Sequence, residues 1–155
     1  MNRKTSKEKT SFGFRNIDEK KKTKKVKEVF DAVSSNYDLM NDLLSFGVHR
    51  LWKRVAVNKC NLRPHHKILD LAGGTGDMVK LMSPKINEKG MLVLSDINLK
   101  MLHFGRDKLI DEGLTNVLTI QLDAQNLPFK ENSFDVISIA FGLRNIANKK
   151  KSLRS

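Results

Sequence analysis

A glycine-rich loop flanked by carboxylates is the part of this sequence best suited to chemistry. Residues 70–77 read Asp-Leu-Ala-Gly-Gly-Thr-Gly-Asp and follow a short apolar run that begins at Lys67. Without Cβ atoms, the backbone at Gly73, Gly74 and Gly76 can approach a ligand closely and adopt positive φ. A loop of this kind between a strand and a helix is typical of nucleotide-like ligand sites. A tight turn with no ligand is the alternative.

Two further carboxylates end the next two apolar runs. Asp96 stands 20 residues after Gly76, about where a carboxylate must lie to bind a ribose diol. Asp123 could accept a hydrogen bond from an adenine amino group, with the backbone of Ala124 alongside. An ordinary turn-forming aspartate is the alternative for Asp123.

The charges around the loop favour S-adenosylmethionine over a dinucleotide. The dinucleotide fingerprint has a further glycine three residues on, to let helix and strand pack closely, and here that position is Val79. Asp70 and Asp77 would repel a pyrophosphate and attract an ammonium group. S-adenosylmethionine carries an ammonium and a sulfonium and no phosphate, so we expect it as the cofactor. NAD and a ligand-free turn are the alternatives.

The elements that must position these residues alternate between short apolar strands and helix-compatible stretches. One helix is expected over 99–112, with Asn98 as its N-cap and Gly113 as its stop. Alternation of this kind predicts a doubly wound α/β parallel sheet, covered on both faces, with its ligand beyond the carboxyl ends of the strands. The predicted strands are 67–72, 91–95, 117–122 and 136–141.

The front of the chain differs in composition from the rest. Residues 1–29 carry eleven Lys/Arg and four Asp/Glu, a net charge of +7 out of +12 for the whole chain. We expect residues 1–22 to form a basic disordered tail, with attraction to anionic lipid as an alternative. Nucleic-acid binding is disfavoured, because no aromatic residues alternate with the lysines. Apolar residues at helical spacing predict a helical cap over 23–61, followed by an α/β part over 65–155.

Several classes of protein are disfavoured. The single cysteine, Cys60, permits no internal disulfide and fits a reducing compartment. The four histidines form no ligand cluster with it, so no metal site is expected. No segment is long enough to span a membrane and no apolar region follows the basic start, which disfavours a secretory signal. We therefore expect a cytoplasmic protein, with peripheral attachment to the inner face of the membrane at most.

Four longer stretches carry a resemblance to a known family. From Phe12-Gly13-Phe14 to the last residue, the chain resembles the ubiquinone/menaquinone biosynthesis C-methyltransferases, which methylate a ring carbon of a polyprenyl benzoquinol or of demethylmenaquinol. The resemblance implies a Rossmann-like, seven-stranded S-adenosylmethionine-dependent methyltransferase domain over 23–155. The stretches are YDLMNDLLSFGVHRLWKR (37–54), ILDLAGGTGD (68–77), LPF and NSFD within 127–135, and FGLRN (141–145).

The resemblance also implies roles for particular residues. Arg144 is similar in position to an arginine that helps to deprotonate the quinol, and since an arginine stays protonated we interpret it as stabilising the phenolate. Tyr37 and His49 are candidates for the substrate pocket, with core packing or helix capping as the alternative. The implied cofactor-contact positions are Thr75, Asp96, Asp123, Ala124 and Ala140. Ala140 replaces a serine found in relatives, so we expect a weakened contact there.

The strand count is incomplete for such a fold. Only about four of seven strands are recognisable, and in relatives a further strand lies next to the fourth. Without it, the apolar run 136–141 would be an exposed sheet edge. The reading that competes with an active enzyme is therefore a truncated, inactive remnant or an interaction module that keeps part of the cofactor site. The sequence does not determine the oligomeric state.

Overall fold

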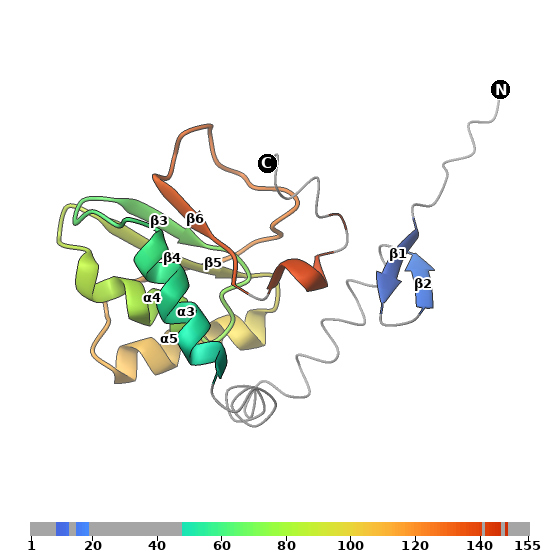
Figure 1. Ribbon diagram of the computed structural model, residues 1–155, viewed down its shortest axis with the longest axis horizontal. Coiled ribbons are helices and arrows are strands. Elements are labelled where there is room, and N and C mark those ends of the chain that lie inside the picture. Colours follow the sequence, from blue (N-terminus) through green and yellow to red (C-terminus); the bar gives the residue numbers. More distant parts are fainter. Residues whose placement is uncertain (1–8, 13–14, 19–47, 141, 147, 149–155) are drawn as a thin grey trace.

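The computed structural model describes residues 9–12, 15–18, 48–140, 142–146 and 148 (Figure 1). Most of the predicted helical cap, 23–61, lies outside these residues, and so does Tyr37. The part of the cap that is described forms helix α3 (Val48–Lys59).

A parallel four-stranded sheet forms the centre of the molecule, as the sequence predicts. Its strands are ordered β5-β4-β3-β6 and every neighbouring pair is parallel. The last strand is shorter than the predicted 136–141, because its ladder with β3 stops at the pair Asp70↔Ser138, where β3 itself ends. The strands are β3 (Lys67–Asp70), β4 (Met91–Asp96), β5 (Leu118–Gln121) and β6 (Val136–Ser138).

The described helices cover one face of this sheet. Alternation along the strands directs Ile68, Leu92 and Leu94 into a core with α3, α4 (Asp77–Met82) and α5 (Leu99–Asp111). The other face, which carries Leu69 and Val93, is covered by loop residues, among them Leu127, Phe129 and Phe134. Both faces of the sheet are therefore covered, as the sequence predicts, one by helices and the other by loops within the described residues.

Helix α5 begins where the sequence predicts and ends at Asp111, one residue before the predicted end. The Asn98 side chain accepts a hydrogen bond from Met101 N at 3.1 Å and so caps the first turn. Beyond the last turn, Gly113 adopts φ +81°, the left-handed conformation that ends many helices. Two short 3-10 helices complete the described elements, η2 (Ser83–Lys85) and η3 (Gly142–Asn145).

A glycine inside α5 allows the helix to press against the glycine-rich loop. A Cβ atom at Gly105 would lie 2.5 Å from Gly74 O and 3.1 Å from Leu94 Cδ2. Neither neighbour can withdraw cheaply, because one is backbone and the other is fully buried. The loop is thus held between strand β4 and helix α5.

Part of the predicted basic tail has regular structure. Strands β1 (Lys9–Phe12) and β2 (Arg15–Asp18) form an antiparallel pair in which Phe12 is opposite Arg15. Two residues, Gly13 and Phe14, connect them in sequence, a loop length typical of tight hairpins with glycine. These eight residues therefore form strands, although the sequence predicts disorder over 1–22.

We predict that Gly105→Ala destabilises the protein. At a solvent-exposed position of a helix, this change would stabilise the folded protein by about 1 kcal/mol through helix propensity. Here the added methyl group meets the carbonyl of Gly74, so we expect a net loss of about 1 to 3 kcal/mol in the free energy of unfolding, measured by urea denaturation. Lys100→Ala, at an exposed position of the same helix, is the control and should be nearly neutral. A stabilised Gly105→Ala variant would contradict the close contact.

Candidate functional site

The glycine-rich loop takes a conformation that its sequence makes possible. Gly74 and Gly76 have φ of +56° and +80°, which residues with side chains rarely adopt. Ala72 also has a positive φ, +51°, so the alanine occupies a position at which glycine would be less strained. The loop is tied to the sheet by Gly73 N, which donates to Ser95 O at 2.9 Å.

Gly73 is the point where no side chain fits. A Cβ atom there would lie 2.5 Å from Leu94 Cδ1 and 2.6 Å from Asp70 Oδ2. The backbone of the loop therefore lies directly on the buried end of β3 and on β4. Its amide groups are brought to the carboxyl edge of the sheet, where parallel α/β proteins bind their ligands.

Asp96 connects the loop to the end of β4. Its Oδ2 accepts a hydrogen bond from Gly74 N at 3.0 Å, and its Oδ1 accepts one from Asn98 N at 2.8 Å. Burial raises the pKa of Asp96, and the backbone N–H groups of Asn98, Gly74 and Ile97 act against this rise. Each carboxylate oxygen keeps a second lone pair, so the residue retains acceptor capacity for a ligand.

Asp70 is buried beneath the loop and does not face the solvent. Its side chain is 0% exposed, its Oδ1 accepts a hydrogen bond from Ser138 Oγ at 2.5 Å, and its Oδ2 has no partner among the described residues. Burial raises the pKa of Asp70 to about 7, against the lowering effects of Ser138 and Lys53. Its role in binding a ligand therefore stays a prediction. Its charge acts from below Gly73.

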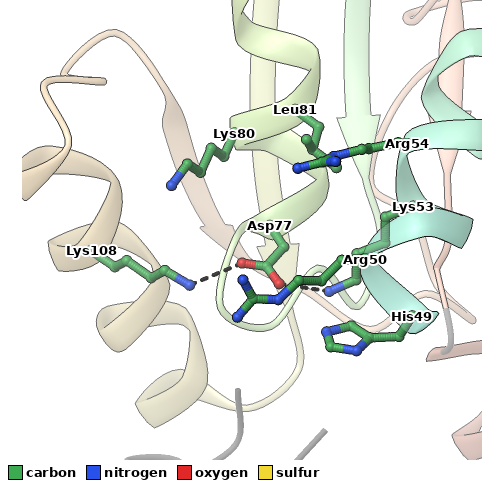
Figure 2. Close-up of a pocket in the computed structure, with 8 residues that line it drawn as sticks. All are labelled: His49, Arg50, Lys53, Arg54, Asp77, Lys80, Leu81 and Lys108. Atoms are coloured by element: carbon green, nitrogen blue, oxygen red, sulfur yellow. Dashed lines mark hydrogen bonds and ion pairs between the residues drawn. The ribbon is translucent and has the colours of Figure 1, made fainter. Parts of the chain in front are cut away.

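Asp77 does not supply the free negative charge that the sequence suggested. Its two carboxylate oxygens accept hydrogen bonds from Lys53 Nζ at 2.7 Å and Lys108 Nζ at 2.9 Å (Figure 2). Burial would raise the pKa of Asp77, but the hydrogen bonds and charges of the two lysines outweigh it and lower the pKa. The carboxylate is thus neutralised by α3 and α5, and its part in attracting an ammonium group is corrected.

Asp123 and Ala124 lie beside Asp96, at the end of the neighbouring strand. Leu122 N donates to Asp96 O at 3.2 Å, which places the two strand ends side by side. Asp123 Oδ1 accepts a hydrogen bond from Gln125 N at 2.9 Å, the arrangement of a turn-forming aspartate. Ala124 is buried in the core under the loop-covered face. Asp123 Oδ2 accepts a longer hydrogen bond from Asn126 Nδ2 at 3.4 Å, so both oxygens take part in the local turn.

The FGLRN stretch adjoins the loop from the other side. A Cβ atom at Gly142 would lie 2.5 Å from Ala72 Cβ, so η3 approaches the loop closely. Arg144 is exposed on η3. Thr75 is buried within the loop, and Ala140 is half-buried against the helix-side core.

His49 lines a cavity of about 300 Å³ between α3, α4 and α5, and Asp77, directly after the glycine-rich loop, lines the same cavity (Figure 2). Cationic side chains dominate its lining, so the cavity suits an anion better than an apolar quinol ring. The substrate role considered for His49 gains no support from this position. The lining residues are His49, Arg50, Lys53, Arg54, Asp77, Lys80, Leu81 and Lys108.

Four residues of the site were missed by sequence reasoning. Gly105 had a signal, because a glycine inside a helical pattern usually marks close packing. Ser138, Lys53 and Lys108 had none, because they meet their carboxylates across 68, 24 and 31 residues of chain. Among the described residues, no group of three or more His, Cys, Asp or Glu side chains could hold a metal ion.

Comparison with known sequences agrees with the geometry of the site. Residues 17–155 match the ubiE/COQ5 methyltransferase family. The chain is 53% identical over 147 residues to the ubiquinone/menaquinone biosynthesis C-methyltransferase UbiE of Methylococcus capsulatus, covering 94% of this chain and 59% of the relative. It is 51% identical over 150 residues to the protein of that name from Legionella pneumophila (strain Paris), covering 96% and 60%. The chain thus spans about three-fifths of the length of these curated relatives.

Solved structures share the fold at lower identity. A SAM-dependent methyltransferase from Aquifex aeolicus superposes with a TM-score of 0.60 at 24% identity, over 66% of this chain and 54% of that chain. The [4+2]-cyclase SpnF superposes with a TM-score of 0.63 at 17% identity, over 83% and 53%. Since one of these is a cyclase by name, the likeness establishes the Rossmann-like fold and no particular reaction. The match over residues 17–155, in contrast, shows that this chain belongs to the ubiE/COQ5 methyltransferase family.

Proposed function

We propose that the chain is a C-methyltransferase that moves a methyl group from S-adenosylmethionine to a ring carbon of a polyprenyl benzoquinol or of demethylmenaquinol. The observation that carries the proposal is the hydrogen bond from Gly74 N to Asp96 Oδ2, at 3.0 Å, in a member of this family. It joins the glycine-rich loop to an acceptor carboxylate at the carboxyl edge of the sheet. That combination suits a nucleoside whose ribose must be held close to backbone amides.

Different residues at this edge would bind different parts of the cofactor. Asp96 would accept hydrogen bonds from the ribose diol through its remaining lone pairs, and Asp123 would accept one from the adenine amino group beside Ala124. Gly73, Gly74, Thr75 and Gly76 would face the amino-acid end with backbone groups, and Ala140 would close the pocket with its backbone alone. When bound, S-adenosylmethionine supplies an electrophilic methyl group.

Asp70 contributes charge without contact. Its carboxyl group has a pKa of about 7 in the cofactor-free chain, so near neutral pH it is only partly ionised. A bound ammonium or sulfonium group above Gly73 would favour the ionised form, because opposite charges attract strongly where water is excluded. The buried, unpartnered Oδ2 of Asp70 fits a cationic ligand better than a pyrophosphate.

Arg144 is the residue we propose for the chemical step. It lies on η3, which touches the loop at Ala72. Methylation at carbon requires a neighbouring hydroxyl group of the substrate to lose its proton, and a fixed guanidinium stabilises the phenolate that results. Much of the acceleration would come from holding the ring carbon in line with the methyl group.

The apolar substrate places the reaction at a membrane surface. None of the helices in the described residues is long and apolar enough to cross a bilayer. We therefore propose peripheral attachment, to which the net charge of +7 on residues 1–29 would contribute by attraction to anionic lipids.

Calorimetric titration with S-adenosylhomocysteine tests the cofactor site. We expect saturable binding by the chain and no heat with NADH. Asp96→Asn should weaken binding by about 10- to 100-fold, because an amide loses the charge and one acceptor oxygen. Asp111→Asn, on the exposed end of α5, is the matched control. A folded chain that binds no adenosyl-sulfur compound would sink the proposal.

The pH dependence of folding stability should differ between the Asp70→Asn variant and the parent chain. A carboxyl whose folded pKa is raised favours folding at low pH and loses that contribution as pH rises from about 4 through about 7. The variant lacks this loss, so its stability relative to the parent chain should increase between pH 5 and pH 8, by about 2 to 3 kcal/mol. Urea midpoints across this range measure it. Asp135→Asn is the control, because the lowered pKa of Asp135 confines its effect to more acidic pH.

Mass spectrometry of quinol products tests the reaction itself. We expect the quinol mass to increase by one CH₂ unit, because a methyl group replaces a ring hydrogen that leaves as a proton, when the chain is incubated with S-adenosylmethionine and a reduced short-tail benzoquinone or demethylmenaquinone in detergent. Arg144→Lys should lower kcat by about 10- to 100-fold and leave the cofactor KM unchanged, since a lysine keeps the charge but not the planar fork. Normal cofactor binding with no product at all would favour the inactive remnant instead.

A further inference from the structure

The cavity between α3, α4 and α5 is lined mainly by basic side chains (Figure 2). Helix α3 contributes three of the Lys/Arg side chains, and α4 and α5 contribute one each. Among the described lining residues, Asp77 is the only acidic one. Because like charges repel, such a cluster opposes folding unless negative charge offsets it. The basic lining residues are Arg50, Lys53, Arg54, Lys80 and Lys108, beside His49.

The carboxylates near the cavity offset only part of this charge. Asp77 accepts hydrogen bonds from Lys53 Nζ at 2.7 Å and from Lys108 Nζ at 2.9 Å, so one negative charge is shared by two cations. Glu112, which lies outside the lining, accepts a hydrogen bond from Lys80 Nζ at 2.7 Å. With both carboxylates counted, the five Lys/Arg of the lining keep a net charge of +3. The described residues therefore leave the cavity positive.

The centre of this basic cluster is partly shielded from water. The side chains of Lys53, Asp77 and Lys108 are 12%, 24% and 27% exposed. Clefts lined by one sign of charge, with walls that exclude water, focus the electric field and raise the local concentration of counter-ions. The cavity volume of about 300 Å³ is far larger than a single water molecule needs, so a polyatomic anion fits.

We propose that this cavity is a binding site for a phosphate or diphosphate group. A phosphate group carries about two negative charges at neutral pH and three acceptor oxygens, so it offsets more of the lining charge than a carboxylate does. The guanidinium group of Arg54 matches phosphate geometry with two parallel hydrogen bonds, and Lys80 acts as a point charge from the neighbouring helix α4. The lysines that hold Asp77 add long-range attraction without leaving that carboxylate.

The phosphate group has two sources that share this chemistry. One is a soluble phosphate ester or diphosphate, and the other is the headgroup of an anionic phospholipid. A bound headgroup would hold the chain beside the bilayer that dissolves a polyprenyl substrate, and this consequence rests on the proposed function. The site itself does not rest on it, because it needs only the cations of α3, α4 and α5.

Calorimetric titration with sodium pyrophosphate tests the site. In about 0.15 M sodium chloride, which screens exposed charges, we expect saturable binding at one site per chain. Arg54→Gln should weaken binding by about 10- to 100-fold, because it removes a hydrogen bond between charged groups. The variant keeps both lysines that hold Asp77. Arg63→Gln, at an exposed arginine outside the lining, removes the same charge and should leave binding unchanged.

Sedimentation with vesicles separates the two sources. Phosphatidylcholine vesicles that contain phosphatidic acid present a phosphate monoester at their surface. If the site takes a headgroup, the chain sediments with these vesicles and Arg54→Gln reduces the bound fraction several-fold. If it takes a soluble ligand, pyrophosphate binds as above and Arg54→Gln sediments like the parent chain. The basic residues of 1–29 are the same in both proteins, so their attraction to lipid cancels in this comparison.

Three results would overturn the proposal. The first is neither heat nor a rise in the urea midpoint when pyrophosphate is added. The second is weakening by Arg54→Gln that is no greater than weakening by Arg63→Gln, which would indicate diffuse attraction to a basic surface. The third is loss of pyrophosphate binding in saturating S-adenosylhomocysteine, which would assign the cations to the carboxylate of the cofactor. Circular dichroism checks that both variants fold. Since methyl transfer is not measured, failure here leaves the proposed function standing.

Discussion

The close approach of three backbone segments is the constraint on which the site depends. The glycine-rich loop fits between β4 and α5 because Gly73 and Gly105 have no side chains, and Cβ atoms at either would lie 2.5 Å from a neighbouring atom. This fit brings Gly74 N to Asp96 and sets the loop above Asp70. A single methyl group at either glycine would separate the loop from the carboxylates that give the crevice its chemistry.

The acidic residues of the crevice do not all carry a free negative charge. Asp77 is neutralised by two lysines, and Asp70 is held near its ionisation midpoint at neutral pH by burial. Asp96 is left as the carboxylate fixed at the strand ends by backbone N–H groups. A cationic ligand is therefore favoured by two groups: the tethered carboxylate of Asp96 and the buried carboxyl of Asp70, which ionises readily when a cation is near.

Local patterns predicted the elements, and long-range contacts set the properties of the site. The apolar runs, the Asn98 cap and Gly113 are encoded within a few residues, so the four strands and α5 could be located from sequence. The pairing of Asp77 with Lys53 and Lys108 joins three helices and left no local signal. The hydrogen bond to buried Asp70 likewise comes from a β6 residue 68 positions away. Acidic residues were thus located correctly, while their charge states were not predictable.

The hydrogen bond between Ser138 and Asp70 has an implication for communication through the sheet. Ser138 ends β6, and its hydroxyl group is the direct hydrogen-bond partner of the buried carboxyl on the neighbouring strand β3. This hydrogen bond favours the anionic form of Asp70, so loss of the hydroxyl group would raise the pKa of the carboxyl further. Ionisation of Asp70 and binding of a cation above Gly73 would favour each other, because such linkage is reciprocal. A side chain on one strand would thereby influence how strongly the crevice at the end of another attracts a cation.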